Sequence, residues 1–234
     1  MKSANLCEII GNISEPRLET YRKVDNFEED ELLSFYFKIQ EISSHFFVPI
    51  QVLEISLRNR LNTELNNLCK TRKNWKGKKW HHVIRPDLSD SSKTMLDRAK
   101  PDTCQAEGDW VARLSFGFWV YLLDKKHRNN ENPYSFWQYI DEKVFPYKGK
   151  KSIKEIFDIL KRVNRVRNRL YHYEPIWKET KQHKLNKNIV INKMKQEYNK
   201  IYEAIGLVSL ENKNLMERLN FKEEFYKCCT WNYK

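Results

Sequence analysis

Breaks between secondary-structure elements are scarce in this sequence. Among 234 residues only six are glycine and seven are proline, whereas leucine, lysine, glutamate and asparagine are common. Strands and tight turns usually end at glycine or proline, so few strand-and-turn units can be placed. The length suits one large domain, or one domain with a helical extension. We therefore expect an all-α protein.

Apolar residues recur at steps of three and four in several stretches, which predicts helices. These helices are expected over residues 28–47, 50–70, 89–100, 107–128, 152–172, 190–205 and 209–230. Pro49 separates the first two. The segment from Thr71 to Asp87 has no clean period and is expected to be a basic loop.

The helix over 152–172 has both of its ends written in the sequence. Ser152 followed by Glu155 has the spacing of a capping box, which opens a helix. Glu174 precedes Pro175, and a residue before proline is pushed out of the helical region. We therefore expect this helix to end just before that pair.

Basic residues exceed acidic ones strongly and unevenly. Forty-three lysines and arginines against thirty-one aspartates and glutamates leave a formal charge of +12. Residues 70–85 include seven basic and no acidic side chains, and residues 143–169 include ten against two. This excess favours a polyanionic partner such as nucleic acid. Two plain solvated surfaces are the alternative.

Cysteine usage and hydropathy indicate a cytoplasmic, soluble protein. The five cysteines are an odd, scattered set, and the first ten residues lack the apolar core of a signal peptide. The longest apolar run, from Ser115 to Leu123, is about half as long as a membrane span. Cys69, His81, His82 and Cys104 contain no CxxC or HxxxH pair, so we expect no metal and no cofactor.

One face of the helix expected at 152–172 changes from apolar to polar along its length. The face consists of Ile153, Ile156, Phe157, Leu160, Asn164, Arg167, Asn168, Tyr171 and His172. Its first four residues form an ordinary core stripe. A guanidinium is costly to bury without partners, so Arg167 should either pair or line a wet site.

Helical spacing lets Arg167, Asn168 and His172 reach one pocket. Asn168 and His172 are four residues apart, and Arg167 directly precedes Asn168. The alternative is that Arg167 bridges to a carboxylate such as Glu54 on a packed helix, with His172 a polar residue at a fraying helix end. Spacing alone leaves both interpretations open.

Three blocks of residues resemble the Abi-like proteins of bacterial abortive infection, a family with HEPN domains. RNRLYHYEPIW at 167–177 resembles their Arg-Asn-Arg, His, Glu-Pro run, which includes the HEPN pattern of Arg, a polar residue, three variable residues and His. LEISLRNRL at 53–61 and VARLSFGFWVYLL at 111–123 resemble two further blocks, in the expected order. Relatives frequently have a second histidine where this chain has Tyr173.

The resemblance implies a domain organisation and a fold. It covers roughly residues 28–177, the expected HEPN-like helical bundle, with residues 1–27 as an N-terminal extension. Residues 178–234 would then be a C-terminal helical extension packed on the same domain.

The resemblance also implies an activity: cleavage of RNA without a metal, in a homodimer whose two motifs meet in one cleft. The ribose 2′-OH attacks the phosphorus, leaving a 2′,3′-cyclic phosphate and a 5′-hydroxyl. His172 would be the general acid and base, because histidine has the ordinary pKa nearest neutrality. Arg167 would bind the phosphate and stabilise the transition state, and Asn168 would orient either group.

Other residues are expected to support or bind RNA. The basic loop would stack bases on its tryptophans and hold phosphates with its cations, unless it is a plain surface loop. The expected RNA-binding residues are Lys70, Arg72, Lys73, Trp75, Lys76, Lys78, Lys79, Trp80, Arg162, Arg165 and Arg169. The supporting residues are Glu54, Arg58, Asn164 and Tyr171.

Two of these expectations carry a structural alternative. The spacing of Glu54 and Arg58 is that of a structural ion pair; lining the cleft is the alternative. Arg58 opens a second Arg-Asn run, but Thr63 stands where its histidine would fall. The aromatic residues around Gly117, in Val111 to Leu123, are expected to form core with a close helix contact.

The partner would be an RNA substrate, and a structured non-coding RNA antitoxin would suit the same charge. A non-catalytic RNA-binding protein is the main alternative function. A DNA-binding regulator is weaker, since no helix-turn-helix pair is recognisable.

Overall fold

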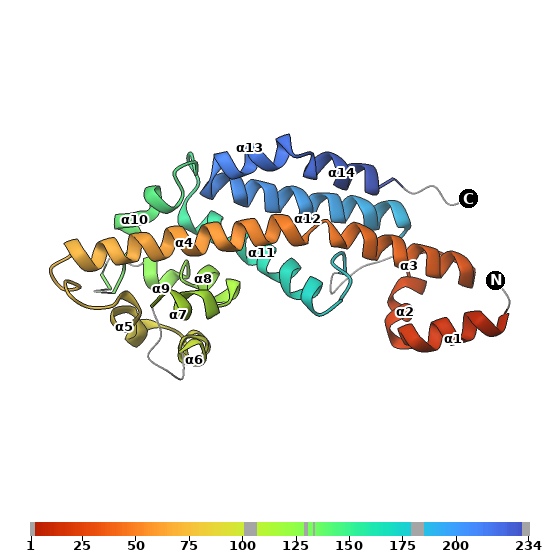
Figure 1. Cartoon of the computed structure of the whole chain (residues 1–234), viewed down its shortest axis with the longest axis horizontal. Helices are drawn as coiled ribbons and strands as arrows, with labels where there is room; N and C mark the ends of the chain where they lie inside the picture. Colours follow the sequence, from red (N-terminus) through yellow and green to blue (C-terminus); the bar gives the residue numbers. More distant parts are fainter. Residues whose placement is uncertain (1–2, 101–106, 129–130, 133, 179–184, 231–234) are drawn as a thin grey trace. The chain divides into compact units, whose positions relative to one another are not determined.

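A computed structural model describes residues 3–100, 107–128, 131–132, 134–178 and 185–230 (Figure 1). All regular secondary structure in these ranges is helical, which confirms the expected all-α class. None of the helices in these ranges is long and apolar enough to cross a membrane. Cys104 lies outside the described residues.

The helices follow one another along the chain with short connections. They are α1 (Ser3–Ile13), α2 (Glu15–Arg22), α3 (Glu29–Ser44), α4 (Phe47–Thr71), α5 (Trp80–Ile84), the 3₁₀ helix η1 (Arg85–Asp87), α6 (Asp90–Ala99), α7 (Glu107–Arg113), α8 (Phe116–Tyr121), α9 (Lys125–Arg128), α10 (Trp137–Val144), α11 (Ile153–Tyr171), α12 (Lys187–Val208), α13 (Leu210–Arg218) and α14 (Phe221–Cys228).

Helices α3, α4, α6, α11 and α12 confirm five of the expected helices to within a few residues. The capping box is also confirmed, because the Ser152 amide donates to the Glu155 carboxylate at 2.8 Å. Pro49 does not separate α3 from α4 as expected; it lies in the first turn of α4, where a missing N–H costs nothing. The helices separate at His45 and Phe46 instead.

Three expected segments are divided differently. The single helix expected over 107–128 is wrong. Ser115 begins α8 by accepting a hydrogen bond from the Phe118 amide, which separates α8 from α7, and α8 ends at Tyr121, before α9 begins at Lys125. The stretch 209–230 forms α13 and α14, because Asn220 adopts a left-handed conformation with φ 61°. The loop expected over 71–87 is also wrong in its second half, which holds α5 and η1.

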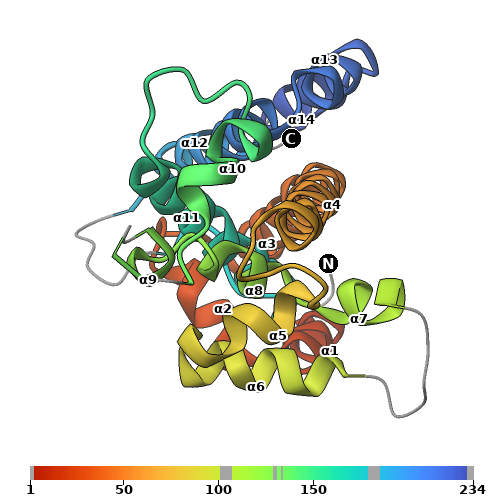
Figure 2. The same cartoon turned by 90° about the vertical axis from the view of Figure 1, so that its left-hand side faces the viewer.

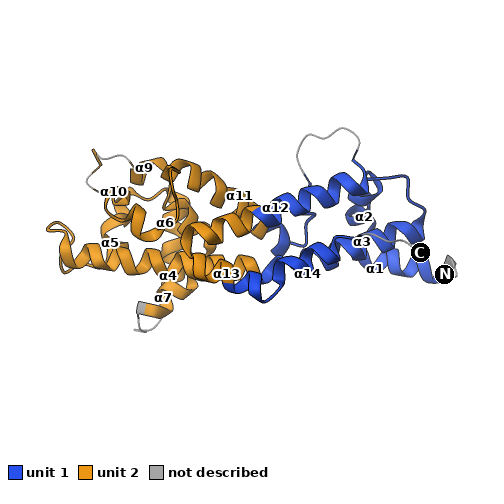
Figure 3. Ribbon diagram, turned by 90° about the horizontal axis from the view of Figure 1, so that it is seen from above, with its two compact units in different colours: residues 1–48, 168–199, 215–234 blue, residues 49–167, 200–214 orange. Residues whose placement is uncertain are grey.

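The described chain divides into two compact units that interleave in sequence (Figure 3). Unit 1 comprises residues 1–48, 168–199 and 215–234, and unit 2 comprises residues 49–167 and 200–214. One division falls inside α11, between Arg167 and Asn168. The boundaries expected after residues 27 and 177 are not among these divisions.

Unit 1 has an aromatic core to which its three sequence segments contribute. Tyr21 of α2 makes edge contacts with Tyr36 at 5.1 Å and with Trp177 at 5.7 Å between ring centroids. A second cluster stacks Tyr198 on Phe225 at 3.7 Å, with Phe46 edge-on to both. Helix α2 packs on α3, and α14 also contacts α3.

Unit 2 contains a close contact between α8 and α11, and several aromatic side chains of α8 are buried. Phe118 and Trp119 are fully buried, and α6 lies against α7 and α8 (Figure 2). A Cβ at Gly117 would lie 3.4 Å from Nδ2 of Asn164 on α11. The expectation of core packing with a close helix contact at Gly117 is therefore confirmed.

His81 of α5 is a buried imidazole in unit 2. Its side chain is 2% exposed, its ring centroid lies 3.8 Å from that of Trp110, and neither ring nitrogen has a hydrogen-bond partner among the described residues. Burial above all, together with the neighbouring His82 and Lys79, lowers the pKa of His81 to about 4. His81 is therefore neutral in the folded protein near neutral pH.

We expect His81 to make the protein less stable in acid. Below pH 6.5 the unfolded chain takes up a proton on His81, whereas the folded protein does so only near pH 4. Its contribution is therefore complete above pH 6.5 and is lost as the pH falls from 6.5 to 4, by up to roughly 3 kcal/mol. Urea unfolding across this range should show a shallower decline for His81→Phe than for wild type, and the control His45→Gln, which does not touch the surroundings of His81, should decline as wild type does.

Candidate active site

Arg167 of α11 is paired with Glu54 of α4 within unit 2. Its Nε lies 3.7 Å from Oε2 of Glu54, and the two side chains are 23% and 21% exposed. This is the structural interpretation left open by the sequence, and the pair is formed. Arg58 donates its Nε to Oδ1 of Asn59 at 3.3 Å. The expected Glu54–Arg58 ion pair is therefore wrong, because Glu54 pairs across to α11 instead.

Asn164 lies one turn before Arg167 and is buried against α8. Its side chain is 7% exposed, and its Oδ1 accepts no hydrogen bond from any described residue. The amide meets the open face of Gly117. An acceptor left unpaired in this way costs stability.

His172 is the residue at which α11 stops, in unit 1. The His172 amide donates to the carbonyl of Asn168 at 3.0 Å, and both side chains are exposed. Tyr173 then has φ 55°, its amide donates to Leu170, and the Glu174 amide donates to Arg169 at 2.8 Å. These two bonds form a Schellman motif with His172 at the C-cap.

A pocket of about 490 Å³ opens beside His172 within unit 1. Arg17 holds one wall by donating to the Tyr173 carbonyl at 3.4 Å, and Arg169 donates to the Ile176 carbonyl at 3.1 Å. The pocket is lined by Ser14, Pro16, Arg17, Thr20, Arg169, His172, Tyr173, Glu174, Pro175 and Lys178. Three permanent cations and one carboxylate surround it, which favours an anionic occupant.

Helix α2 supplies a wall of this pocket, which sequence reasoning missed. Residues 1–27 carried no motif and were expected only as an extension. No sequence pattern indicates that Pro16 and Arg17 lie near His172. Leu18 and Tyr21 are fully buried, so the helix that carries Arg17 is anchored to the core of unit 1.

The expectation that Trp75 and Trp80 stack on RNA bases is wrong. Their side chains are 1% and 0% exposed. Trp80 donates its Nε1 to Oδ1 of Asn62 at 2.9 Å, and Trp75 packs against Phe136. A base cannot reach rings that are covered by the core of unit 2.

The basic side chains of the same segment divide into structural and exposed groups. Arg72 donates to the Ser135 carbonyl at 2.8 Å and lies over the rings of Trp75 and Tyr139, so it holds the turn together. The exposed group, which remains available to an anion, is Lys70, Lys73, Lys76, Lys78 and Lys79.

The remaining predicted residues lie on or beside α11. Arg165 is exposed, and Arg162 and Arg169 are partly exposed. Tyr171 is half exposed and packs its ring edge-on against Phe47 at 5.7 Å, so its contact is with the end of the first segment of unit 1.

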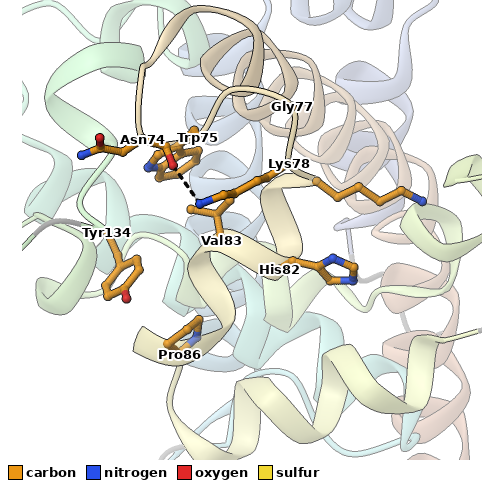
Figure 4. Close-up of a pocket in the computed structure, with 9 residues that line it drawn as sticks. Asn74, Trp75, Gly77, Lys78, His82, Val83, Pro86 and Tyr134 are labelled. Atoms are coloured by element: carbon orange, nitrogen blue, oxygen red, sulfur yellow. Dashed lines mark hydrogen bonds between the residues drawn. The ribbon is translucent and has the colours of Figure 1, made fainter.

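A second pocket, of about 710 Å³, lies in unit 2 (Figure 4). It is lined by Asn74, Trp75, Gly77, Lys78, Lys79, His82, Val83, Pro86 and Tyr134. Sequence reasoning identified its lysines but missed His82 and Tyr134 as partners of them. The described residues contain no cluster of three histidine, cysteine or acidic side chains that could hold a metal ion.

Comparisons with models of protein families, with curated proteins and with solved structures found no match for this chain. The resemblance to Abi-like proteins stays a prediction that rests on the three blocks of residues.

Proposed function

We propose that the chain is a metal-independent endoribonuclease of the HEPN type that acts in bacterial phage defence in the cytoplasm. The observation that carries the proposal is the Arg-Asn-x-x-x-His pattern ending at His172, whose backbone is held at a helix C-cap and whose exposed imidazole lines a basic pocket. An exposed imidazole beside an anion-favouring pocket suits proton transfer at a phosphate.

The reaction needs proton transfers and charge stabilisation. A base takes the proton of the ribose 2′-OH, the 2′-oxygen attacks phosphorus, and the departing 5′-oxygen receives a proton. In the proposal His172 supplies an imidazole for these transfers. Arg167 binds the phosphate oxygens and stabilises the charge that develops on them, and Asn168 orients either group.

The Glu54 carboxylate suits a positioning role in this scheme. An arginine that is paired with a carboxylate has a restricted side-chain orientation, which lowers the entropic cost of presenting it to a substrate. The pair also keeps a partly buried guanidinium from being left without a counter-charge. Glu54 is thus a positioning residue, and Arg167 is the residue that touches the phosphate.

We expect the active species to be a homodimer. Each chain supplies one motif, and the resemblance implies a cleft in which two motifs meet. Mass photometry at the enzyme concentration used for cleavage should show dimers, and dilution below the dissociation constant should remove activity. Full activity of a monomer would overturn the composite cleft.

The proposal is tested by incubating purified protein with end-labelled transfer RNA and with unstructured RNA in EDTA. We expect discrete cleavage that EDTA does not inhibit. Catalytically inert protein that binds RNA tightly would support the second candidate, a non-catalytic protein holding a structured non-coding RNA.

The observation that favours this second candidate is the Arg167–Glu54 ion pair, which gives Arg167 a structural role without catalysis. Both candidates predict RNA binding that weakens with salt. Cleavage separates them.

A further inference from the structure

The pocket in unit 2 combines an apolar floor with a basic rim. Val83 is 9% exposed and Trp75 is 1% exposed, so the floor is made of side chains anchored in the core. Lys78, Lys79 and His82 are exposed on the rim. In Figure 4, Tyr134 and Pro86 form the wall that faces Lys78 across Val83.

No carboxylate lines this pocket among the residues that the structure describes, so the positive charge of its rim is not balanced by these walls. A third pocket, in the same unit, differs in this respect. That pocket is also rich in lysine, but Glu155 and Glu203 line it, and Lys151 lies 3.7 Å from Glu203. Lysines that are already paired with carboxylates attract a further anion weakly. Of these two pockets, the one lined by Lys78 and Lys79 therefore suits an anion better.

The turn that carries the lysines is held in one shape. The Gly77 amide donates to the Cys69 carbonyl at 3.2 Å, and Gly77 has φ 76°, which favours glycine. Nζ of Lys78 donates to the Asn74 carbonyl at 3.2 Å. An ammonium has three donors, so this bond orients Lys78 across the pocket and leaves it able to donate to a ligand.

We propose that this pocket binds one nucleotide unit of a single-stranded RNA, with the base against the Tyr134 ring and the phosphate at Lys78, Lys79 and His82. This inference rests on the proposed RNA function and specifies its substrate class. The apolar floor suits a flat ring and the basic rim suits a phosphate, and a nucleotide has both groups. The volume lies within the ~300–1,000 Å³ typical of small-ligand sites.

We expect the pocket to bind single-stranded rather than duplex RNA, because Tyr134 needs an exposed base face to stack on. In a duplex both faces of each base are covered by its neighbours in the stack, whereas an unpaired base can turn out onto a protein ring. A free mononucleotide has the same chemistry as one RNA unit. The experiment therefore includes both.

Fluorescence anisotropy with labelled hexauridylate and hexaadenylate tests the pocket. The protein carries His172→Ala, in EDTA, so that binding is measured without cleavage. Tyr134→Ala should weaken binding about tenfold, and Tyr134→Phe, which keeps the ring, should bind as the parent does. Equal affinity of Tyr134→Ala and parent would overturn the role of the ring.

A lysine comparison tests the phosphate contact. Lys78→Ala with Lys79→Ala should weaken binding by roughly tenfold or more and flatten its salt dependence. The matched control, Lys70→Ala with Lys73→Ala, removes the same charge from exposed positions outside the pocket and should have a clearly smaller effect. Equal effects of the two pairs would overturn the pocket as the contact, and unchanged melting temperatures would exclude a folding defect.

Crosslinking locates the base directly. A hexanucleotide containing 4-thiouridine should crosslink to Tyr134 or His82, as mapped by mass spectrometry, and crosslinks elsewhere would overturn the proposal. Displacement of the labelled RNA by uridine or adenosine monophosphate at low concentration would identify free nucleotide as an occupant too. A protein that crosslinks here but never cuts RNA would refute the proposed enzyme and leave this pocket standing.

Discussion

Replacing His172 by alanine is expected to lower the rate of RNA cleavage about 10²- to 10⁴-fold, the usual contribution of a positioned general acid or base. RNA affinity should stay close to that of wild type, because the change removes one imidazole and leaves the surrounding cations in place. Single-turnover cleavage in EDTA gives the rate, and anisotropy with an uncleavable RNA gives the affinity. The exposed position of His172 at the C-cap makes a large loss of stability unexpected.

The matched control is His45→Gln, which removes another imidazole of unit 1 outside the motif. Its rate should equal that of wild type. If the His172→Ala protein cleaves RNA at the wild-type rate, His172 is only a polar residue at the end of the helix and has no role in catalysis.

Replacing Arg167 by alanine is expected to have two effects with separate causes. Cleavage should fall about 10²- to 10³-fold because a donor to the developing negative charge is lost. The free energy of unfolding should fall by about 1 kcal/mol because Glu54, which is mostly buried, loses its ionic partner. Single-turnover kinetics and urea unfolding measure the two effects independently.

A double variant separates catalysis from structure at this ion pair. Adding Glu54→Gln to Arg167→Ala removes the unpaired charge and should restore most of the lost stability without restoring cleavage. Recovery of cleavage together with stability would show that Arg167 serves only the fold. Glu54→Gln alone should retain measurable cleavage, since Glu54 positions the guanidinium without touching the phosphate.

Much of the helical fold could be predicted because its signals are local. The apolar spacing of α3, α4 and α11, and the capping box at Ser152, depend on neighbours within one or two turns. Helices α2 and α10 were missed because each has only eight residues, too few to repeat an apolar pattern over several turns. Helix α1, of 11 residues, was missed as well. The breaks at Ser115 and Asn220 were also missed, because at each of them the backbone conformation of one residue interrupts an apolar pattern that continues beyond it.

The candidate site was predictable in its motif and not in its surroundings. The spacing of Arg167, Asn168 and His172 follows from one helix, and Glu54 was correctly named as the possible partner of Arg167. Trp75 and Trp80 misled because exposed lysines flank them, while the groups that bury them, Phe136 and Asn62, lie elsewhere in the sequence.

The pocket walls share this dependence on distant segments. Arg17 lines a pocket with the end of α11, and Tyr134 lines a pocket with Lys78. Neither sequence segment alone indicates which residues will lie opposite it. Sequence patterns therefore identified the charged residues and could not identify the residues opposite them.

The chemistry of the RNA ends tests the central claim most directly. Purified protein is incubated in EDTA with an RNA of defined sequence, alongside a copy that carries a single 2′-deoxy substitution at the cleavage position. The account predicts a 2′,3′-cyclic phosphate and a 5′-hydroxyl from the first RNA and no cut at that position in the second. Products that end in a 3′-hydroxyl, or cleavage that persists at the deoxy position, would contradict attack by the ribose 2′-OH.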